Sequence, residues 1–413
     1  MISVGMDISK GKSTVCLRRH TGEVLREPFE IFHSEEDLDA LCTLLEGCAA
    51  QEEVRVVMEA TGIYHLPALM HLQQEGFFVA VINPLMMKKF AAQHIRRGKN
   101  DKRDAMKIAA YGIEKWYQLE NFTPEKKLYE ELRMYGRQYS HYVGLKIKAK
   151  QNLSCLLERV MPGIVSLLPF DHTGMARKDK LLDFVEEFRH FERIAAMGEA
   201  EFVQSYKAWA HRNGYHAGSK KAAEIYRLAA GSVTTLEASR KSTEMLLSHS
   251  LHTLREMMNL CTEILLEMQE LAMQLPEYGT VRSMNGVGDV LAVRLIAEIG
   301  DVRRFHSPGA LVAYAGIDSP EFQSGTFSAT KRHISKRGSA LLRKIGYEVM
   351  QSLKRVRCES DPVYCYMQKK EQEGKNKKVC KVAGMNKFFR IYYARVMQVY
   401  RQGQSMETLA VAG

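Results

Sequence analysis

The chain has 413 residues, of which 26% are charged and 46% hydrophobic, with 29 Gly and 10 Pro. This composition fits a folded protein and excludes collagen-like, low-complexity and largely disordered classes. The length favours two or three domains. No apolar run approaches the roughly 20 residues of a membrane helix, and the N-terminus lacks the apolar core of a signal peptide. Eight cysteines without a CxxC pair or zinc spacing predict reduced thiols in a cytoplasmic protein.

The formal net charge of +11 is unevenly distributed. Residues 1–95 hold 8 Lys and Arg against 13 Asp and Glu, whereas the remainder holds 51 against 35. The basic residues form three clusters: Arg96, Arg97, Lys99, Lys102 and Arg103; Lys331, Arg332, Lys336, Arg337, Arg343 and Lys344; and the lysines of 369–381. These clusters are either solvated helix faces or phosphate-binding surfaces. An acidic unit followed by a basic remainder favours a metal-dependent enzyme acting on nucleic acid.

The first segment predicts an α/β domain over residues 1–115. Residues 2–8, 13–19 and about 23–32 are typical of three strands joined by tight turns. A helix over 35–48 and a short apolar strand over 54–60 follow. Another helix then leads to a strand over 77–83, which stops before Pro84. This order of elements is that of the ribonuclease-H-like fold.

Residues 116–279 predict a helical region. Apolar residues follow helical spacing from 128 to 160, with Lys146 as the one break. From Leu247 to Leu275 they alternate steps of four and three without a miss, and Pro276 follows. This period favours a central coiled coil, within the chain or between subunits. The alternative is two long helices that pack only in their own domain. Residues 165–240 predict helices without an evident chemical role.

Residues 280–413 predict a third, mainly helical domain, with helices over 340–357 and 384–401. Gly286 and Gly288 form a Gly-x-Gly turn before an amphipathic helix that Gly300 closes. This element resembles a helix–hairpin–helix, whose turn amides accept a phosphate. An ordinary turn between helices is the alternative.

Four carboxylates are candidate metal ligands. Asp7 lies within an apolar strand, where an acid is costly unless it is paired or binds a metal. Glu59 ends a buried strand, where α/β folds place ligands. Asp101 and Asp104 share one face at a helix start.

Two strands and one helix thus supply the oxygen ligands that a pair of Mg²⁺ ions requires. One alternative for Asp7 is the phosphate-binding turn of an actin-like sugar kinase, but no second glycine-rich phosphate loop is evident. For Asp101 and Asp104 the alternative is a plain pair of charges at a helix N-terminus.

Ser324 is a candidate nucleophile. It precedes Gly325 in a predicted loop and is followed by the basic cluster at 331–337, so it could attack a phosphodiester. Serines beside glycine are more often ordinary turn residues, and Ser319, Ser328 and Ser335 are weaker candidates.

Seven motifs in this order resemble the DEDD insertion-sequence transposases, the one-ten family of bacterial mobile elements that includes the Piv/MooV-type DNA invertases. The motifs are MDISKGKSTVCL, MEATGIYH, RRGKNDKRDA, NGVGDVLA, LVAYAGID, QSG and ISKRGSALLR. The resemblance covers most of the chain and is weakest over 165–240. The wording QSGTF departs from the Ser-Gly-Gly or Ser-Gly-Lys of many members, which puts the residues after the serine in doubt.

The resemblance implies a RuvC-like N-terminal domain with catalytic, metal-binding Asp7, Glu59, Asp101 and Asp104, and a C-terminal transposase domain with Ser324 as nucleophile. It implies Mg²⁺, with Mn²⁺ as a substitute, and a covalent serine–DNA intermediate. The implied partners are donor and target DNA, a structured guide RNA from the element, and further copies of the chain in a homodimer or homotetramer. The implied location is the bacterial cytoplasm, at the nucleoid. Nucleic-acid contacts are expected at Arg96, Arg97, Lys99, Lys102, Arg103, Gly286, Gly288, Lys331, Arg332, Lys336 and Arg337.

Three functions therefore compete. A recombinase needs the four acids and Ser324, whereas a RuvC-like structure-specific endonuclease needs only the acids, with water as the attacking group. A non-catalytic nucleic-acid-binding scaffold needs neither.

Overall fold

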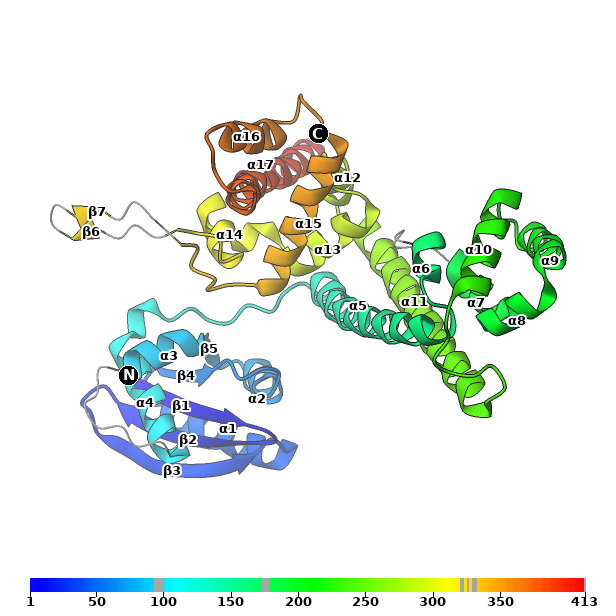
Figure 1. Cartoon of the computed structure of the whole chain (residues 1–413). Coiled ribbons are helices and arrows are strands. Elements are labelled where there is room, and N and C mark those ends of the chain that lie inside the picture. The colour runs from blue at the N-terminus through cyan, green and yellow to red at the C-terminus, as the bar shows by residue number, and fades with distance from the viewer. Residues whose placement is uncertain (93–99, 172–177, 320–322, 325–326, 329–332, 412–413) are drawn as a thin grey trace. The chain divides into compact units, whose positions relative to one another are not determined.

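The computed structural model describes residues 1–92, 100–171, 178–319, 323–324, 327–328 and 333–411. The chain forms two compact units, Met1–Pro124 and Glu125–Gly413 (Figure 1). A mixed α/β unit is therefore followed by a mainly helical one, as the sequence predicts.

The first unit is built on one five-stranded sheet. Its elements are β1 (Ile2–Ser9), β2 (Lys12–Arg19), β3 (Val24–Phe32), α1 (Glu35–Ala49), β4 (Val54–Glu59), α2 (Leu66–Gln74), β5 (Phe78–Ile82), α3 (Pro84–Ala91), α4 (Asp101–Glu114) and the 3₁₀ turn η1 (Trp116–Gln118). The strand order is β3-β2-β1-β4-β5. β1, β2 and β3 pair antiparallel, while β1, β4 and β5 pair parallel. The predicted order of strands and helices is confirmed.

Helices cover both faces of this sheet. One face packs with α1 and α2 through residues such as Val4, Leu41 and Leu72. The other face packs with α3 and α4 through Val57 and Ile108, among others. Because side chains alternate along a strand, the apolar run of β4 supplies both cores, which explains why this strand is almost continuously hydrophobic. The apolar residues of β1 all enter the first core.

Pro84 does more than end the strand β5. It opens α3, and Asn83 caps that helix by accepting a hydrogen bond from the Leu85 amide at 2.9 Å. Proline suits the first turn of a helix because its missing N–H has no partner there.

The second unit contains two long helices and two groups of shorter elements. They are α5 (Lys127–Val160), α6 (Ile164–Leu167), α7 (Lys180–Phe188), α8 (Phe191–Met197), α9 (Glu199–Arg212), α10 (Ser219–Gly231), α11 (Lys241–Met273), α12 (Tyr278–Arg282), α13 (Asp289–Ile299), the 3₁₀ turn η2 (Val302–Arg304), α14 (Pro308–Tyr314), β6 (Gln323–Ser324), β7 (Phe327–Ser328), α15 (Ala340–Val356), α16 (Pro362–Gln372) and α17 (Lys377–Val411).

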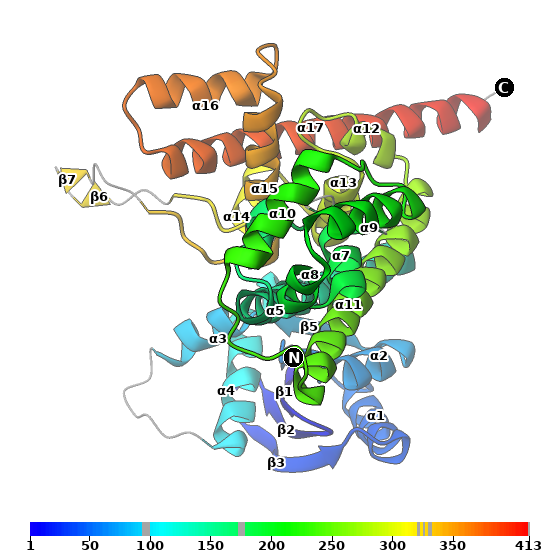
Figure 2. The same cartoon turned by 45° about the vertical axis from the view of Figure 1, so that its right-hand side comes forward.

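The helices α5 and α11 lie side by side (Figures 1 and 2). At one end they pack with α6–α10 around aromatic residues such as Phe184 and Trp209. At the other end they pack with α12–α17. The predicted seam of α11 is divided between these cores: Leu247, Leu251 and Leu254 lie in the first, and the segment from Cys261 to Ala272 lies in the second. This chain itself therefore buries most of the seam.

The helix α13 differs from its predicted amphipathic character. Every residue from Ala292 to Ile299 is buried, including Arg294 and Glu298, each 8% exposed. Arg294 donates to Glu348 of α15 at 2.5 Å, and Ser339 donates to Glu298 at 2.5 Å. Its polar residues therefore form buried hydrogen bonds instead of a solvent-facing side.

All eight cysteines are free thiols. Among the described residues, no helix is long and apolar enough to cross a lipid bilayer.

Candidate active site

Asp7 and Glu59 follow matching positions on adjacent strands. β1 and β4 pair in parallel from Ile2 with Val54 to Met6 with Met58, and the next residue on each strand is an acid. Neighbouring strands lie about 4.8 Å apart. The two carboxylates therefore leave the same face of the sheet from adjacent strands.

Two glycines allow α4 to lie directly on β1. A Cβ atom on Gly5 would come 2.3 Å from the carbonyl oxygen of Ala105 and 2.3 Å from the amide nitrogen of Ala109. A Cβ atom on Gly112 would come 2.1 Å from the Oγ atom of Ser3. Ser3, near the start of β1, thus lies beside Gly112, near the end of α4. The helix α4 therefore runs antiparallel to β1.

This packing directs Asp7 toward the start of α4. Asp7 shares a strand face with Ser3 and Gly5 and lies two residues beyond Gly5. Because the helix runs antiparallel to the strand, its first turn lies there, and that turn contains Asp101 and Asp104.

Glu59 and Asp104 line the same cavity, which has a volume of about 470 Å³. Burial raises the pKa of Glu59, and the nearby Asp104 carboxylate raises it further. Lys107 also lines the cavity, and its Nζ atom lies 2.7 Å from Oδ1 of Asp104. The site therefore gathers negative charge that one lysine partly balances.

The oxygen donors of these acids suit a hard divalent cation. The raised pKa of Glu59 is the effect expected of a partly buried carboxyl group beside a second carboxylate. In the described part of the chain, however, no three acidic, His or Cys side chains are grouped closely enough to hold an ion. Asp104 is paired with Lys107, and Asp101 is exposed at the first position of α4.

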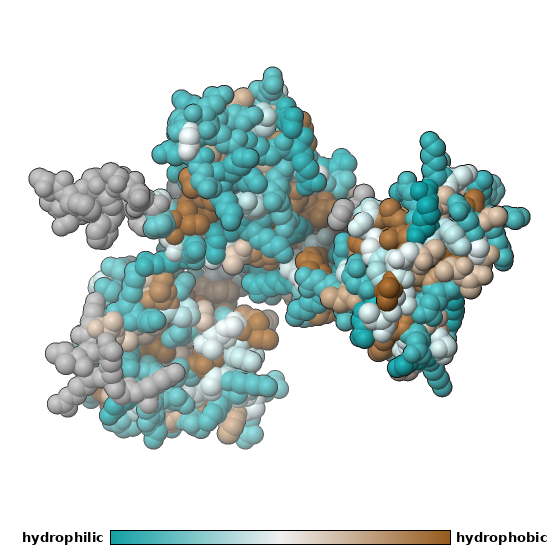
Figure 3. Space-filling model, viewed as in Figure 1, coloured by the Kyte–Doolittle hydropathy of each residue, from teal (hydrophilic) through white to brown (hydrophobic). Residues whose placement is uncertain are grey.

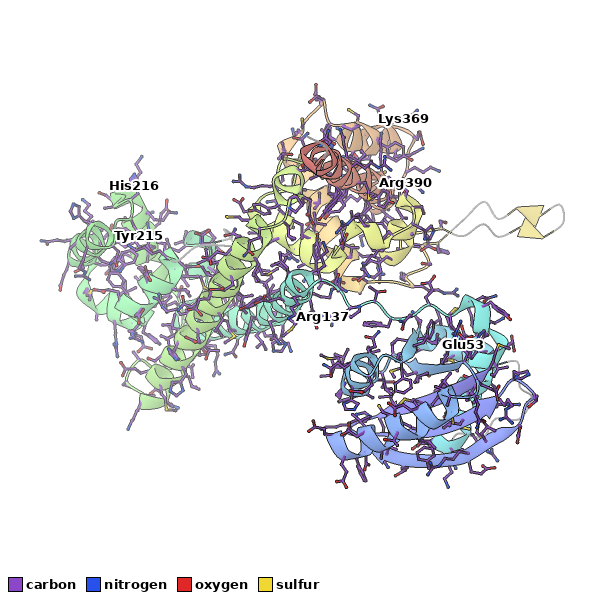
Figure 4. The ribbon with its side chains drawn as sticks, turned by 180° about the vertical axis from the view of Figure 1, so that it is seen from behind. Glu53, Arg137, Tyr215, His216, Lys369 and Arg390 are labelled. Carbon is purple, nitrogen blue, oxygen red and sulfur yellow. The ribbon has the colours of Figure 1, made fainter. Side chains whose placement is uncertain are left out.

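The predicted nucleic-acid contacts have different structural settings. Lys102 and Arg103 are exposed on the first turn of α4, and Lys336 and Arg337 are exposed before α15. The predicted contacts that lie outside the described residues are Arg96, Arg97, Lys99, Lys331 and Arg332. The third basic cluster spans α16 and the start of α17. Figure 4 labels Lys369 on α16, together with Arg390 further along α17.

The Gly-x-Gly turn has a clear structural role. Gly286 has a φ of +77°, and a Cβ atom there would come 2.6 Å from Cγ of Leu353 on α15. Gly288 precedes the first residue of α13 in an extended conformation. Close packing against α15 therefore accounts for Gly286 without a bound phosphate.

Ser324 is placed in a short strand instead of the predicted loop. It belongs to β6, which pairs antiparallel with β7 through Ser324 with Phe327 and Gln323 with Ser328. The neighbouring Gly325 lies outside the described residues. The acids and Ser324 belong to different compact units.

Sequence reasoning missed two groups of residues. Lys107 was not predicted to join the acidic site, although its position three residues after Asp104 puts both on one helix face. His333 and Asn386 line a separate pocket in the second unit, together with Ser319, which the sequence analysis considered only as a weaker nucleophile candidate. No spacing signal could have joined these three, because a fold contact between distant segments brings them together.

Comparison with known proteins identifies two matching segments. Residues 4–162 match a family model for IS110-type DEDD transposases, and residues 278–365 match the model described as the transposase IS116/IS110/IS902 family. The chain is also similar to an uncharacterized 44.8 kDa protein of insertion element IS116 from Streptomyces clavuligerus. The two are 23% identical over 329 residues, which cover 78% of this chain and 77% of the relative.

Proposed function

Because this chain belongs to the IS116/IS110/IS902 family of transposases, we propose that it cuts and rejoins DNA through a covalent serine–DNA bond. The observation that carries the proposal is the acidic site. Glu59 and Asp104 line one cavity, and Asp7 lies on the strand next to Glu59. The strand order β3-β2-β1-β4-β5 supports a RuvC-like assignment for this unit.

In the proposed reaction, the Oγ atom of Ser324 attacks a DNA phosphorus atom. A serine–phosphate bond forms, one phosphodiester bond breaks, and the departing DNA oxygen takes up a proton. A hydroxyl group of another DNA end then attacks the phosphoserine and releases Ser324 with its proton restored. The number of phosphate ester bonds is unchanged, so rejoining requires no ATP.

Asp7, Glu59, Asp101 and Asp104 would hold Mg²⁺, or Mn²⁺ in its place. Bound there, the metal would polarise a phosphoryl oxygen and lower the pKa of a coordinated hydroxyl. The chain's own contribution is to fix the carboxylates through the close packing of α4 on β1. Lys336 and Arg337 would neutralise DNA phosphates, together with Lys331 and Arg332.

A structured guide RNA and a homodimer or homotetramer are also part of this proposal. Since the acids and Ser324 belong to separate units of the chain, the acids of one subunit could act with the serine of another. The RNA would supply target choice by base pairing, as in other guided enzymes. Co-purification of a defined RNA encoded beside the gene would support this part, and a nucleic-acid-free protein with full activity would contradict it.

A denaturing gel with labelled element-end DNA tests the reaction. Wild-type protein with Mg²⁺ is expected to give a covalent protein–DNA band that Ser324→Ala and Glu59→Gln both abolish. Ser328→Ala, a substitution on the neighbouring strand, serves as the matched control and should retain the band. Free DNA ends that persist in Ser324→Ala would instead identify a water-using nuclease, the alternative that the two transposase matches do not favour.

Removal of the metal should affect assembly as well as chemistry. Without a cation, the acidic site repels the DNA phosphates that must enter it. Excess EDTA is therefore expected to weaken the protein–DNA complex in a native gel and to abolish the covalent band. A complex of unchanged affinity in EDTA would show that the acids do not meet DNA through a metal.

A further inference from the structure

A second cavity lies in the helical unit, where the segment that carries Ser324 leaves the domain. Its volume is about 370 Å³, within the range of small-molecule binding pockets. One wall comes from the segments on either side of the β6–β7 region, and the other comes from the first turns of α17. Figure 3 shows hydrophobic surface beside this point of the unit.

Hydrogen bonds fix the first wall. The Ser335 amide donates to the Asp318 carbonyl oxygen at 2.8 Å, and the Lys336 amide donates to the Gly316 carbonyl oxygen at 3.0 Å. The hydroxyl group of Ser335 also donates to the Asp318 carboxylate at 2.5 Å. These hydrogen bonds hold residues 316–318 against residues 335–336, so the first wall of the pocket has a fixed conformation.

The pocket has apolar walls and a polar rim. Ile317, Ile334 and Val382 form apolar surface, and Val379 is 55% exposed although it is a large aliphatic residue. Apolar surface with a few polar groups is typical of sites for small organic ligands.

Asn386 presents a directed polar group at this rim. Arg390 donates to its Oδ1 atom at 2.9 Å, so the group that Asn386 can offer a ligand is its amide donor. Such a donor pairs with acceptor atoms, which the nucleobases carry at different positions on their edges.

The surroundings favour a polyanion. Lys378 lines the pocket, and Lys377 and Lys381 flank it on the same helix. Residues 361–390 contain eight Lys and Arg against three Asp and Glu. If a base occupied the pocket, the phosphates on either side of it would lie near these lysine side chains.

The pocket is also close to Ser324 along the chain. Ser324 follows Ser319 by five positions, and five extended residues span at most about 17 Å. Phosphates of one DNA strand follow each other every 3.4 Å or so along the helix axis. A base in this pocket would thus lie within about five nucleotides of the phosphate that Ser324 attacks.

We infer that this pocket receives one unpaired DNA base next to the cleavage point, and that Asn386 contributes to the choice of that base. The inference rests on the proposed function, since Ser324 must act on DNA for the base to be presented there. In this way the protein would itself read sequence beside the cut.

Equilibrium binding of single strands tests the inference. The probes are fluorescent homothymidine, homocytidine and homoadenosine strands and an abasic strand of equal length, with the full chain in EDTA. Wild-type protein should prefer at least one base-bearing strand over the abasic strand by about 10- to 150-fold, the range expected for burying one apolar group of side-chain size. Ala383→Phe, which fills the pocket, should remove this preference, whereas Ala394→Phe on an exposed part of α17 should retain it.

Two further variants keep the test decisive if Ala383→Phe does not fold. Asn386→Ala should reduce discrimination among the three bases, and Lys378→Ala should weaken all four strands by a similar factor. Equal affinity of wild-type protein for abasic and base-bearing strands would overturn the inference, and so would an unchanged preference in Asn386→Ala. Because the assay needs no cleavage, loss of the covalent band in the gel experiment would refute the proposed function without altering this result.

Discussion

Folding of the metal-free protein favours the protonated form of Glu59, whereas the proposed metal binding uses its ionised form. Burial and the Asp104 carboxylate raise its pKa above the ordinary value of 4.5. The folded state therefore binds this proton more tightly than the unfolded state does. The free energy of unfolding falls as pH rises from 4.5 through the raised pKa, so the ionised acid destabilises the metal-free protein at neutral pH.

Glu59→Gln should consequently raise the melting temperature of the metal-free protein at pH 7 and change it little at pH 4. Thermal unfolding followed by circular dichroism at both pH values measures this difference. Glu53→Gln is the control, because Glu53 is exposed and pairs with Arg55 at 2.8 Å, and it should give no gain at pH 7. A lower melting temperature for Glu59→Gln at pH 7 would contradict the assigned direction of the pKa shift.

Gly5 sets the distance between the strand that carries Asp7 and the helix that carries Asp104. A methyl group there would overlap the α4 backbone, so Gly5→Ala should destabilise the protein by roughly 1–3 kcal/mol through overpacking. It should also weaken Mg²⁺ binding, since the helix must move away from β1. Gly47→Ala, with no atom within 4 Å of the added methyl group, should be neutral or slightly stabilising. Urea unfolding of the two variants measures this difference in the free energy of unfolding.

Among the elements, those specified by local pattern were predictable and those specified by distant contacts were not. The apolar runs of β1 and β4 and the turn before β2 fixed most of the first unit. By contrast, the buried polar groups of α13 find their partners in Glu348 and Ser339, which lie 54 and 41 positions away from the residues they pair with. The spacing of residues along the sequence does not indicate such partners.

The same limit applies to the candidate site. Residue type and strand position were sufficient to select Asp7 and Glu59, because acids in apolar strands are unusual. The pairing of Asp104 with Lys107 follows from their spacing of three on one helix, although the sequence analysis did not include Lys107. The pocket beside Asn386 depends on how α17 packs, so it required the tertiary structure.

A buried cluster of three side chains joins α5, α12 and α17. Tyr129 donates to Glu277 at 2.5 Å, Tyr400 donates to the other carboxylate oxygen at 2.6 Å, and the two hydroxyl oxygens lie 2.6 Å apart. Burial and Glu277 raise the pKa of both tyrosines, so both remain protonated donors at neutral pH. Glu277 is 1% exposed, and these two hydroxyl groups donate to its two carboxylate oxygens.

Tyr400→Phe should therefore cost roughly 1–3 kcal/mol, the penalty for a buried acceptor left without a donor. Hydrogen exchange should show faster exchange of the α12 and α17 amides, while those of β1 and β4 stay unchanged. Tyr117→Phe is the matched control, because Tyr117 is 89% exposed. Equal protection of α17 in both variants would mean that the cluster does not join these helices.

Over the whole molecule, the charge is divided between the two compact units. Residues 1–124 contain 15 Lys and Arg against 17 Asp and Glu, whereas residues 125–413 contain 44 against 31. Phosphate binding should therefore depend mainly on the helical unit, while the first unit meets DNA only where its acids hold a cation. Since each neutralised phosphate releases condensed counterions, the logarithm of the binding constant should fall linearly with the logarithm of salt concentration.

This division predicts which lysines and arginines alter the salt dependence. The double variant Lys336→Ala, Arg337→Ala should lower the slope of that line by about 0.9 for each phosphate that these side chains neutralise in the wild-type complex. Fluorescence titrations of duplex DNA across a series of salt concentrations measure this slope. Lys12→Ala removes a cation of the first unit that is already paired with Glu30 at 3.0 Å, so the slope should stay at the wild-type value. If Lys12→Ala lowers the slope as much as the double variant does, DNA contacts the first unit directly.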